Sequence, residues 1–185
     1  MCIRDSTAAM AATQTMPNIH GHRAAVARSI GSTGAAFGRG ERITVEGRNL
    51  NLLLAKNPTG VNQNIRTVLA DDGPVHVLAA LNDRTADGRD VSWIWDVDWE
   101  PLDGRLASLT LTGDRAWDLA LRFRYGGFDM EAITVEPDVA TALDRAVAAA
   151  AEGDTVHILP TYTAMLDVRS ELADRGHVSA YWEAP

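Results

Sequence analysis

The sequence predicts an α/β domain with a mostly parallel β-sheet flanked by helices. From residue 50 onward, short apolar runs typical of buried strands alternate with segments whose apolar residues recur at helical spacing. With 185 residues, 46% of them hydrophobic and 23% charged, the composition is that of an ordinary globular domain. In such sheets ligands bind at the carboxyl ends of the strands, so we expect function in the loops that follow them.

The first part of this region contains one expected helix among four expected strands. The apolar run 50–55 predicts a strand, and Val61, Ile65 and Val68 then fall at helical spacing until a turn at 71–74. Further strands are predicted at 75–81, 91–96 and 106–112.

The second part alternates regularly between helix and strand. Asp114 is expected to cap a helix that stops at Gly126 and Gly127, and Pro137 is expected to open the next one. The remaining strands are predicted at 133–135 and 155–159, and a last helix over about 163–175.

The chain divides into three predicted parts. Residues 1–6 have the character of a non-native leader, and residues 7–49 that of the end of a preceding domain. Residues 50–185 form the predicted α/β domain.

Charge and cysteine content exclude several functions. Lys and Arg number 17 against 25 Asp and Glu, a net charge of −8 that disfavours binding to nucleic acids and to anionic membrane surfaces. No apolar stretch is long enough to span a bilayer. The only cysteine is Cys2, so an internal disulfide and a Cys-based zinc site are excluded; we expect a cytoplasmic protein without a metal site in this chain.

The segment 82–100 concentrates six carboxylates and three of the five tryptophans. In a strand, alternation would place Trp93 and Trp95 on one face and Asp96 and Asp98 on the other. A carboxylate beside aromatic surface needs a partner, and it could orient a histidine or bind a metal ion. Two alternatives are a solvated acidic face over a Trp-filled core and a protein interface.

A second candidate is the turn 55–60, where Lys56 and Asn57 lie between a strand and a helix. Backbone amides at the start of that helix, together with Lys56, could bind an anion. The alternative is an ordinary turn with Pro58 at the helix start.

The segment 82–98 resembles the C-terminal domain of the MurT family, the Mur-ligase-like subunits of lipid II isoglutaminyl synthase. Three further regions agree in order and spacing: 37–41 ahead of 54–60, then 113–122, then 159–166. The resemblance covers about residues 25–180. It implies a Rossmann-like domain of the Mur ligase C-terminal type, with residues 7–49 as a remnant of the central ATP-binding Mur ligase domain.

The resemblance also implies an activity: ATP- and glutamine-dependent amidation of the D-glutamate α-carboxylate of lipid II to D-isoglutamine. The implied partner is a GatD-type glutamine amidotransferase subunit, whose Cys and His release ammonia from glutamine. ATP and Mg²⁺ would act through the central domain, which in the family also holds zinc. This sequence lacks the phosphate loop and the cysteines of that domain, so we expect the fragment alone to be inactive.

In this family an Asp of the C-terminal domain completes the partner's Cys–His pair, and we predict that Asp96 has this role, ahead of Asp90 and then Asp98. Asn57 aligns with a turn that faces the nucleotide in Mur ligases, which makes it the predicted nucleotide-facing residue. Two other interpretations are a non-catalytic docking module for the amidotransferase subunit, and a generic Mur-ligase-type domain acting on another acidic substrate.

Overall fold

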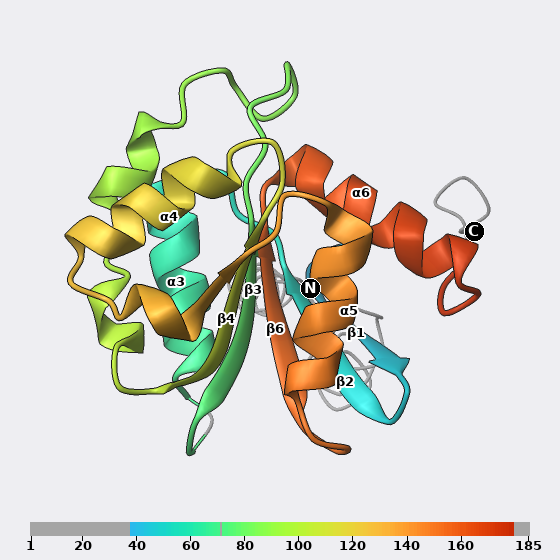
Figure 1. Cartoon of the computed structure of the whole chain (residues 1–185). Coiled ribbons are helices and arrows are strands. Elements are labelled where there is room, and N and C mark those ends of the chain that lie inside the picture. The colour runs from blue at the N-terminus through green and yellow to red at the C-terminus, as the bar shows by residue number, and fades with distance from the viewer. Residues whose placement is uncertain (1–37, 71, 180–185) are drawn as a thin grey trace, which may run out of the picture.

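The computed structural model describes residues 38–70 and 72–179 as a three-layer α/β domain (Figure 1). Its six-stranded sheet has the order β1-β2-β6-β3-β4-β5. β1 and β2 pair antiparallel, and the other neighbouring strands are parallel. The predicted fold class is therefore confirmed; the expectations for residues 1–6 and 7–37 lie outside the described residues.

The strands are β1 (Arg39–Val45), β2 (Arg48–Leu53), β3 (Val75–Ala80), β4 (Leu106–Thr112), β5 (Ile133–Val135) and β6 (Thr155–Pro160). The α-helices are α3 (Pro58–Val68), α4 (Ala116–Tyr125), α5 (Val139–Ala149) and α6 (Tyr162–Asp174). Three short 3₁₀ helices are η2 (Ser92–Asp96), η3 (Glu100–Leu102) and η4 (Met130–Ala132).

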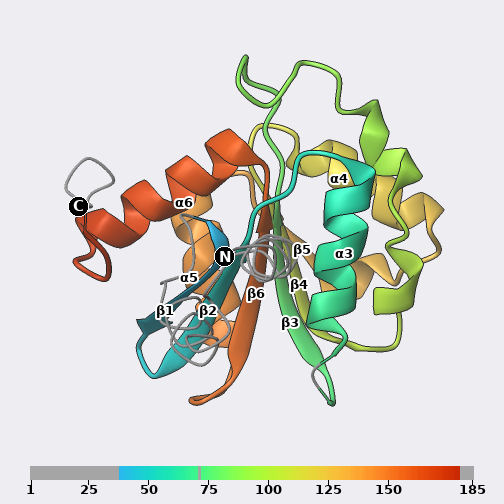
Figure 2. The same ribbon diagram turned by 180° about the vertical axis from the view of Figure 1, so that it is seen from behind.

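Each face of the sheet packs against its own pair of helices (Figures 1 and 2). On one face, Ile65 of α3 and Phe123 of α4 belong to a hydrophobic cluster with Val77 of β3. On the other face, Leu143 of α5 and Met165 of α6 pack in a second cluster that contains Leu78 of β3. Successive residues of a buried strand thus enter opposite cores, which explains why these strands are almost wholly apolar.

Segment 91–96 is not the predicted strand. It forms η2, and the buried residues are Val91, Ile94 and Val97, while Trp95 is exposed. Burial every third residue matches the three residues per turn of a 3₁₀ helix and not the two-residue period of a strand. The prediction that Trp93 and Trp95 share one face is therefore wrong.

The sequence predicted that Asp114 caps α4, and this prediction is wrong. α4 begins two residues later, at Ala116, and has no side-chain cap at Arg115. The carboxylate of Asp114 instead accepts hydrogen bonds from Arg84, at 2.8 and 3.2 Å. The C-terminal end agrees with the prediction, because α4 ends at Tyr125 with Gly126 as its C-cap.

The sheet extends upstream of residue 50. β1 and β2 form a hairpin whose turn residues, Glu46 and Gly47, both have positive φ, as a type I′ turn requires. The expected boundary between residues 49 and 50 falls inside β2. Whether residues 7–49 also derive from a central domain stays a prediction. No helix in the described part of the chain is long and apolar enough to cross a membrane.

Candidate functional site

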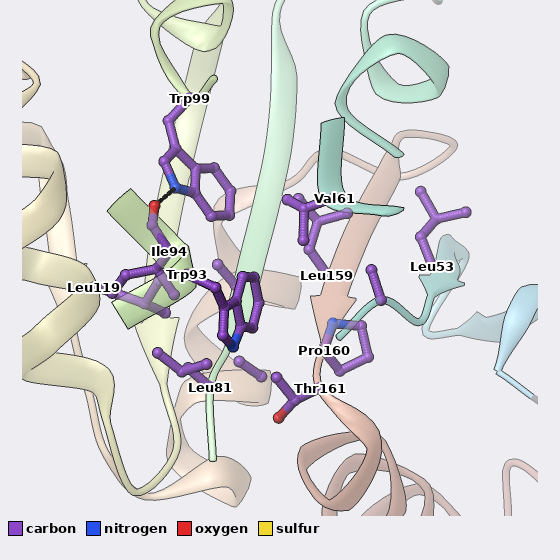
Figure 3. A pocket seen from close by; sticks show the side chains of 13 residues that line it. Leu53, Val61, Leu81, Trp93, Ile94, Trp99, Leu119, Leu159, Pro160 and Thr161 are labelled. Atoms are coloured by element: carbon purple, nitrogen blue, oxygen red, sulfur yellow. Dashed lines mark hydrogen bonds between the residues drawn. The ribbon is translucent and has the colours of Figure 1, made fainter. Parts of the chain in front are cut away.

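The candidate site lies on the long connection between β3 and β4, which carries η2 and η3 and packs against α3 and α4 (Figure 2). An aromatic core packs against this connection. The Trp99 ring lies 5.0 Å from that of Phe123, which in turn contacts Phe128 edge to face at 4.8 Å. Trp99 Nε1 donates a hydrogen bond to the Ile94 carbonyl at 3.3 Å, which ties η2 to this core (Figure 3).

The structure separates the three candidate carboxylates by their partners. Asp90 accepts a hydrogen bond from the Ser92 amide at 2.8 Å, and hydrogen bonds from Ser92 hold the pKa of Asp90 below its ordinary value. Asp98 accepts one from Asn62 Nδ2 at 3.1 Å, while its own amide donates to Asn62 Oδ1 at 3.0 Å.

Asp96, at the end of η2, differs from both neighbours. Its side chain is exposed, and among the described residues none forms a hydrogen bond or ion pair with it. Of the three carboxylates, Asp96 is therefore the one that makes no hydrogen bond within the described part of the chain.

Arg122 of α4 connects the helix to the segment that carries Asp96. Its buried guanidinium donates to the Val97 carbonyl at 2.9 Å and to Glu100 Oε1 at 2.7 Å. It also lies 5.9 Å from the centre of the Trp95 ring, which is cation–π distance. Burial alone would raise the pKa of Glu100, but hydrogen bonds from Arg122 and backbone amides, with the Arg122 charge, hold it below its ordinary value.

Large hydrophobic side chains are exposed on α4 and at Trp95, the residue before Asp96. Trp117, Leu121 and Tyr125 repeat every four residues on α4 and are 67%, 48% and 75% exposed. Trp95 is 46% exposed and packs edge to face on Tyr125, with the ring centres 5.8 Å apart. We call these four residues, three of them aromatic, the aromatic stripe. Helical residues four apart share one face, and Tyr125 contacts Trp95, so the stripe connects one face of α4 to the residue before Asp96.

The apolar pocket in Figure 3 is not a ligand site. Trp93 and Leu81 line it together with Pro160 and Thr161 near the ends of β3 and β6. Its volume is about 20 Å³. That is room for about one water molecule, so we assign this pocket to core packing.

Asn57 caps α3, with Pro58 in the first helical turn. Its Oδ1 accepts a hydrogen bond from the Gly60 amide at 2.8 Å, which matches the turn that was the structural alternative for this segment. The side chain is exposed at the carboxyl edge of the sheet, beyond β2. It does not lie in the cluster around Asp96.

A polar cluster at the same edge escaped the sequence reasoning. Asn82, only 1% exposed, donates to Thr163 Oγ1 and Asp167 Oδ2, both at 3.0 Å. Arg84 bridges Asp114 and Asp167, and these hydrogen bonds raise its pKa. Since the partners lie 30 to 85 residues apart, no local pattern could have revealed them. These bonds join the loops that follow β3 and β4 to the first turns of α6.

The described residues do not form a metal site. They contain no group of three or more His, Cys, Asp or Glu placed to hold a metal ion. Among the basic residues at this edge, Arg84 is bound to Asp114 and Asp167, and Lys56 is exposed beside the cap.

Known proteins similar to this chain were found both as a family model and as individual relatives. Residues 54–165 match the family model "MurT ligase C-terminal". The chain is 36% identical over 144 residues to the Streptococcus pneumoniae R6 protein named lipid II isoglutaminyl synthase (glutamine-hydrolyzing) subunit MurT. That match covers 76% of this chain and 31% of the relative, so the chain spans less than a third of the relative's length.

Two solved structures share the fold. MurF from Acinetobacter baumannii superposes with a TM-score of 0.55 at 14% identity, over 80% of this chain and 32% of MurF. The bifunctional folylpolyglutamate synthase/dihydrofolate synthase from Yersinia pestis gives 0.53 at 20% identity, over 82% of this chain and 34% of the synthase. These likenesses confirm a fold of the Mur ligase type.

Proposed function

Because the chain belongs to the MurT ligase C-terminal family, we propose that it is the C-terminal part of a lipid II isoglutaminyl synthase subunit. The complete protein is a carbon–nitrogen ligase of peptidoglycan synthesis. It amidates the D-glutamate α-carboxylate of lipid II, using ATP and the ammonia that a GatD-type glutaminase subunit releases from glutamine. The name of the Streptococcus pneumoniae relative, a glutamine-hydrolysing synthase subunit, supports this reaction.

Within that enzyme, Asp96 completes the Cys–His pair of the glutaminase. A carboxylate that accepts a hydrogen bond from imidazole fixes the ring tautomer and stabilises the imidazolium that forms when the thiol loses its proton. The observation that carries this assignment is the exposed Asp96 carboxylate, whose two rivals are already engaged by Ser92 and Asn62. The aromatic stripe beside Asp96 supports a protein partner at this surface, since Trp and Tyr are enriched in interfaces.

ATP, Mg²⁺ and the zinc of the family belong to the central domain in this proposal. The described residues contain no group of three or more His, Cys, Asp or Glu that could hold a metal ion, so no step performed by this chain runs through Mg²⁺ or zinc. Asn57 stays our proposed nucleotide-facing residue. Its Oδ1 is committed to the helix cap, so its Nδ2 is the atom that would donate to the nucleotide.

The experiment that tests the proposal reconstitutes the complete subunit with a GatD-type glutaminase. We expect lipid II to be converted to its isoglutamine form with glutamine and ATP, measured by mass spectrometry of the muropeptides. Free ammonia should replace glutamine without the glutaminase subunit. Conversion of another acidic substrate, with lipid II left unchanged, would contradict the proposal and favour a different ligase.

The aromatic stripe favours a second candidate function, in which this domain only docks the glutaminase. Single exposed apolar residues are common, but four of the five large hydrophobics that are exposed in the described part of the chain lie on this one surface. In this alternative the stripe binds the partner and Asp96 has no chemical role.

Replacing Trp117 by Ala in the complete subunit is expected to weaken the complex with the glutaminase. Truncation of a tryptophan at the centre of an interface costs about 2 kcal/mol or more of binding free energy. A loss of that size corresponds to a Kd roughly 30-fold higher. Titration calorimetry measures the change, and Tyr162→Ala is the control because Tyr162 is exposed on α6, on the other side of the sheet. Equal affinities for the two variants would show that the stripe does not bind this partner.

A further inference from the structure

We infer that Arg122 is the positioning residue of this site: it holds segment 95–97 so that Asp96 meets the partner's imidazole. The inference rests on the proposed function, because it assigns a task only if Asp96 acts on the glutaminase. Arg122 itself does not reach the reacting atoms. It acts through the backbone and ring that flank Asp96.

The contacts of Arg122 bracket Asp96 in the sequence. Its guanidinium lies over the ring of Trp95, the residue before Asp96, at 5.9 Å from the ring centre. It donates to the carbonyl of Val97, the residue after Asp96, at 2.9 Å. In the described part of the chain, no other side chain donates a hydrogen bond to the backbone of residues 95–97.

Segment 95–97 needs an external support. η2 is five residues long, and its backbone turns to an extended conformation at Val97, which has φ −87° and ψ 133°. A 3₁₀ helix of this length has little stability of its own. Trp99 fixes the start of the segment through Ile94, and its own amide donates to the Val97 carbonyl at 3.1 Å. Asn62 fixes Asp98 behind it. Among the described side chains, only that of Arg122 adds a hydrogen bond to the backbone of 95–97.

The environment of Arg122 suits orientation better than stability. Its side chain is 8% exposed, while its ion-pair partner Glu100 is 51% exposed. Burial of the Arg122 charge costs hydration free energy, and an ion pair with a half-exposed carboxylate offsets little of that cost. An apolar side chain of similar volume in place of Arg122 would often give equal stability. The specific gain is geometric: a guanidinium on a rigid helix donates to a carbonyl and a carboxylate and stacks on an aromatic ring at once.

The test replaces Arg122 by Met in the complete subunit assembled with its glutaminase. Met keeps the buried stem and removes the guanidinium. A catalytic group misplaced by about 1 Å can lose up to roughly 100-fold in rate, so we expect kcat for glutamine hydrolysis to fall roughly 10- to 100-fold. The KM for glutamine and the rate with free ammonia should not change, because Arg122 touches neither the glutamine site nor the synthetase centre.

Arg124→Met is the matched control. Arg124 is exposed on the same helix, two residues after Arg122. It forms no hydrogen bond or ion pair with residues 92–100, all of which the structure describes. We expect its kcat to stay within about twofold of the parent enzyme, as for most surface substitutions. Hydrogen exchange at the amides of 95–98 should be faster in Arg122→Met and unchanged in Arg124→Met.

The outcomes distinguish this inference from the proposed function. If Asp96→Asn abolishes glutamine hydrolysis but Arg122→Met keeps parental kcat, the role of Arg122 is overturned and the role of Asp96 stands. If Asp96→Asn leaves hydrolysis intact, the proposed role of Asp96 fails first. Should Arg122→Met not fold, Arg122→Lys decides, because Lys keeps the charge but lacks the planar guanidinium that lies over the Trp95 ring while it donates to Val97 and Glu100. A kcat for Lys equal to the parent value would overturn the inference.

Discussion

Replacing Asp96 by Asn in the complete two-subunit enzyme is expected to abolish glutamine-dependent amidation and to leave ammonia-dependent amidation intact. Asn keeps the shape of the side chain but loses its charge, and its amide favours the wrong imidazole tautomer. In triads of this kind the same replacement costs on the order of 10⁴ in turnover. Glutamate release measures the glutaminase, and amidated lipid II measures the synthetase, so the two losses can be read separately.

Asp90→Asn and Asp98→Asn are the controls, matched in chemistry and lying within six residues of Asp96. Both carboxylates are bonded within the chain, to Ser92 and Asn62 respectively, and we expect glutaminase rates close to the parent. Loss of hydrolysis in Asp90→Asn alone would move the triad role to Asp90. Normal hydrolysis in all three variants, with an intact complex, would favour the docking-module function.

The sequence alone could separate these carboxylates only in part. The bond from the Ser92 amide to Asp90 is local, two residues apart, and an Asp followed two residues later by Ser is a common turn pattern. The engagement of Asp98 depends on Asn62, which is 36 residues away and comes from α3. That contact arises only when the β3–β4 connection folds over α3, so the hydrogen bond that engages Asp98 could not be predicted from a local pattern.

The strands that are buried on both faces were predictable from the sequence, whereas the structure of the aromatic segment 91–96 was not. β3 and β6 nearly coincide with the predicted ranges 75–81 and 155–159, because a short apolar run between turns has few other solutions. In 91–96 the aromatic content favoured a strand, while the three-residue spacing of Val91, Ile94 and Val97 was the better signal. β1 was missed because its first four residues, Arg39 to Arg42, are polar or glycine and continue a turn-rich stretch, so only Ile43 to Val45 carry a strand pattern.

Replacing Phe123 by Ala is expected to destabilise the chain by about 3–5 kcal/mol, the cost of removing a buried aromatic ring and leaving a cavity. Phe123 has no exposed surface and contacts both Trp99 and Phe128. Urea denaturation followed by Trp fluorescence gives the free energy of unfolding. Leu121→Ala on the same helix is the control: its side chain is 48% exposed and should cost no more than about 0.5 kcal/mol.

The Phe123 variant also tests whether the site and the core form one structural unit. Trp99 lies between the Phe123 ring and the Ile94 carbonyl, so a cavity at Phe123 loosens η2 as well as α4. We therefore expect Phe123→Ala and Trp99→Ala to be non-additive, with a coupling of about 0.5–1.5 kcal/mol, the range of aromatic pairs. Additive losses would mean that η2 is held independently of this core, and Arg122 would then be its main link to the domain.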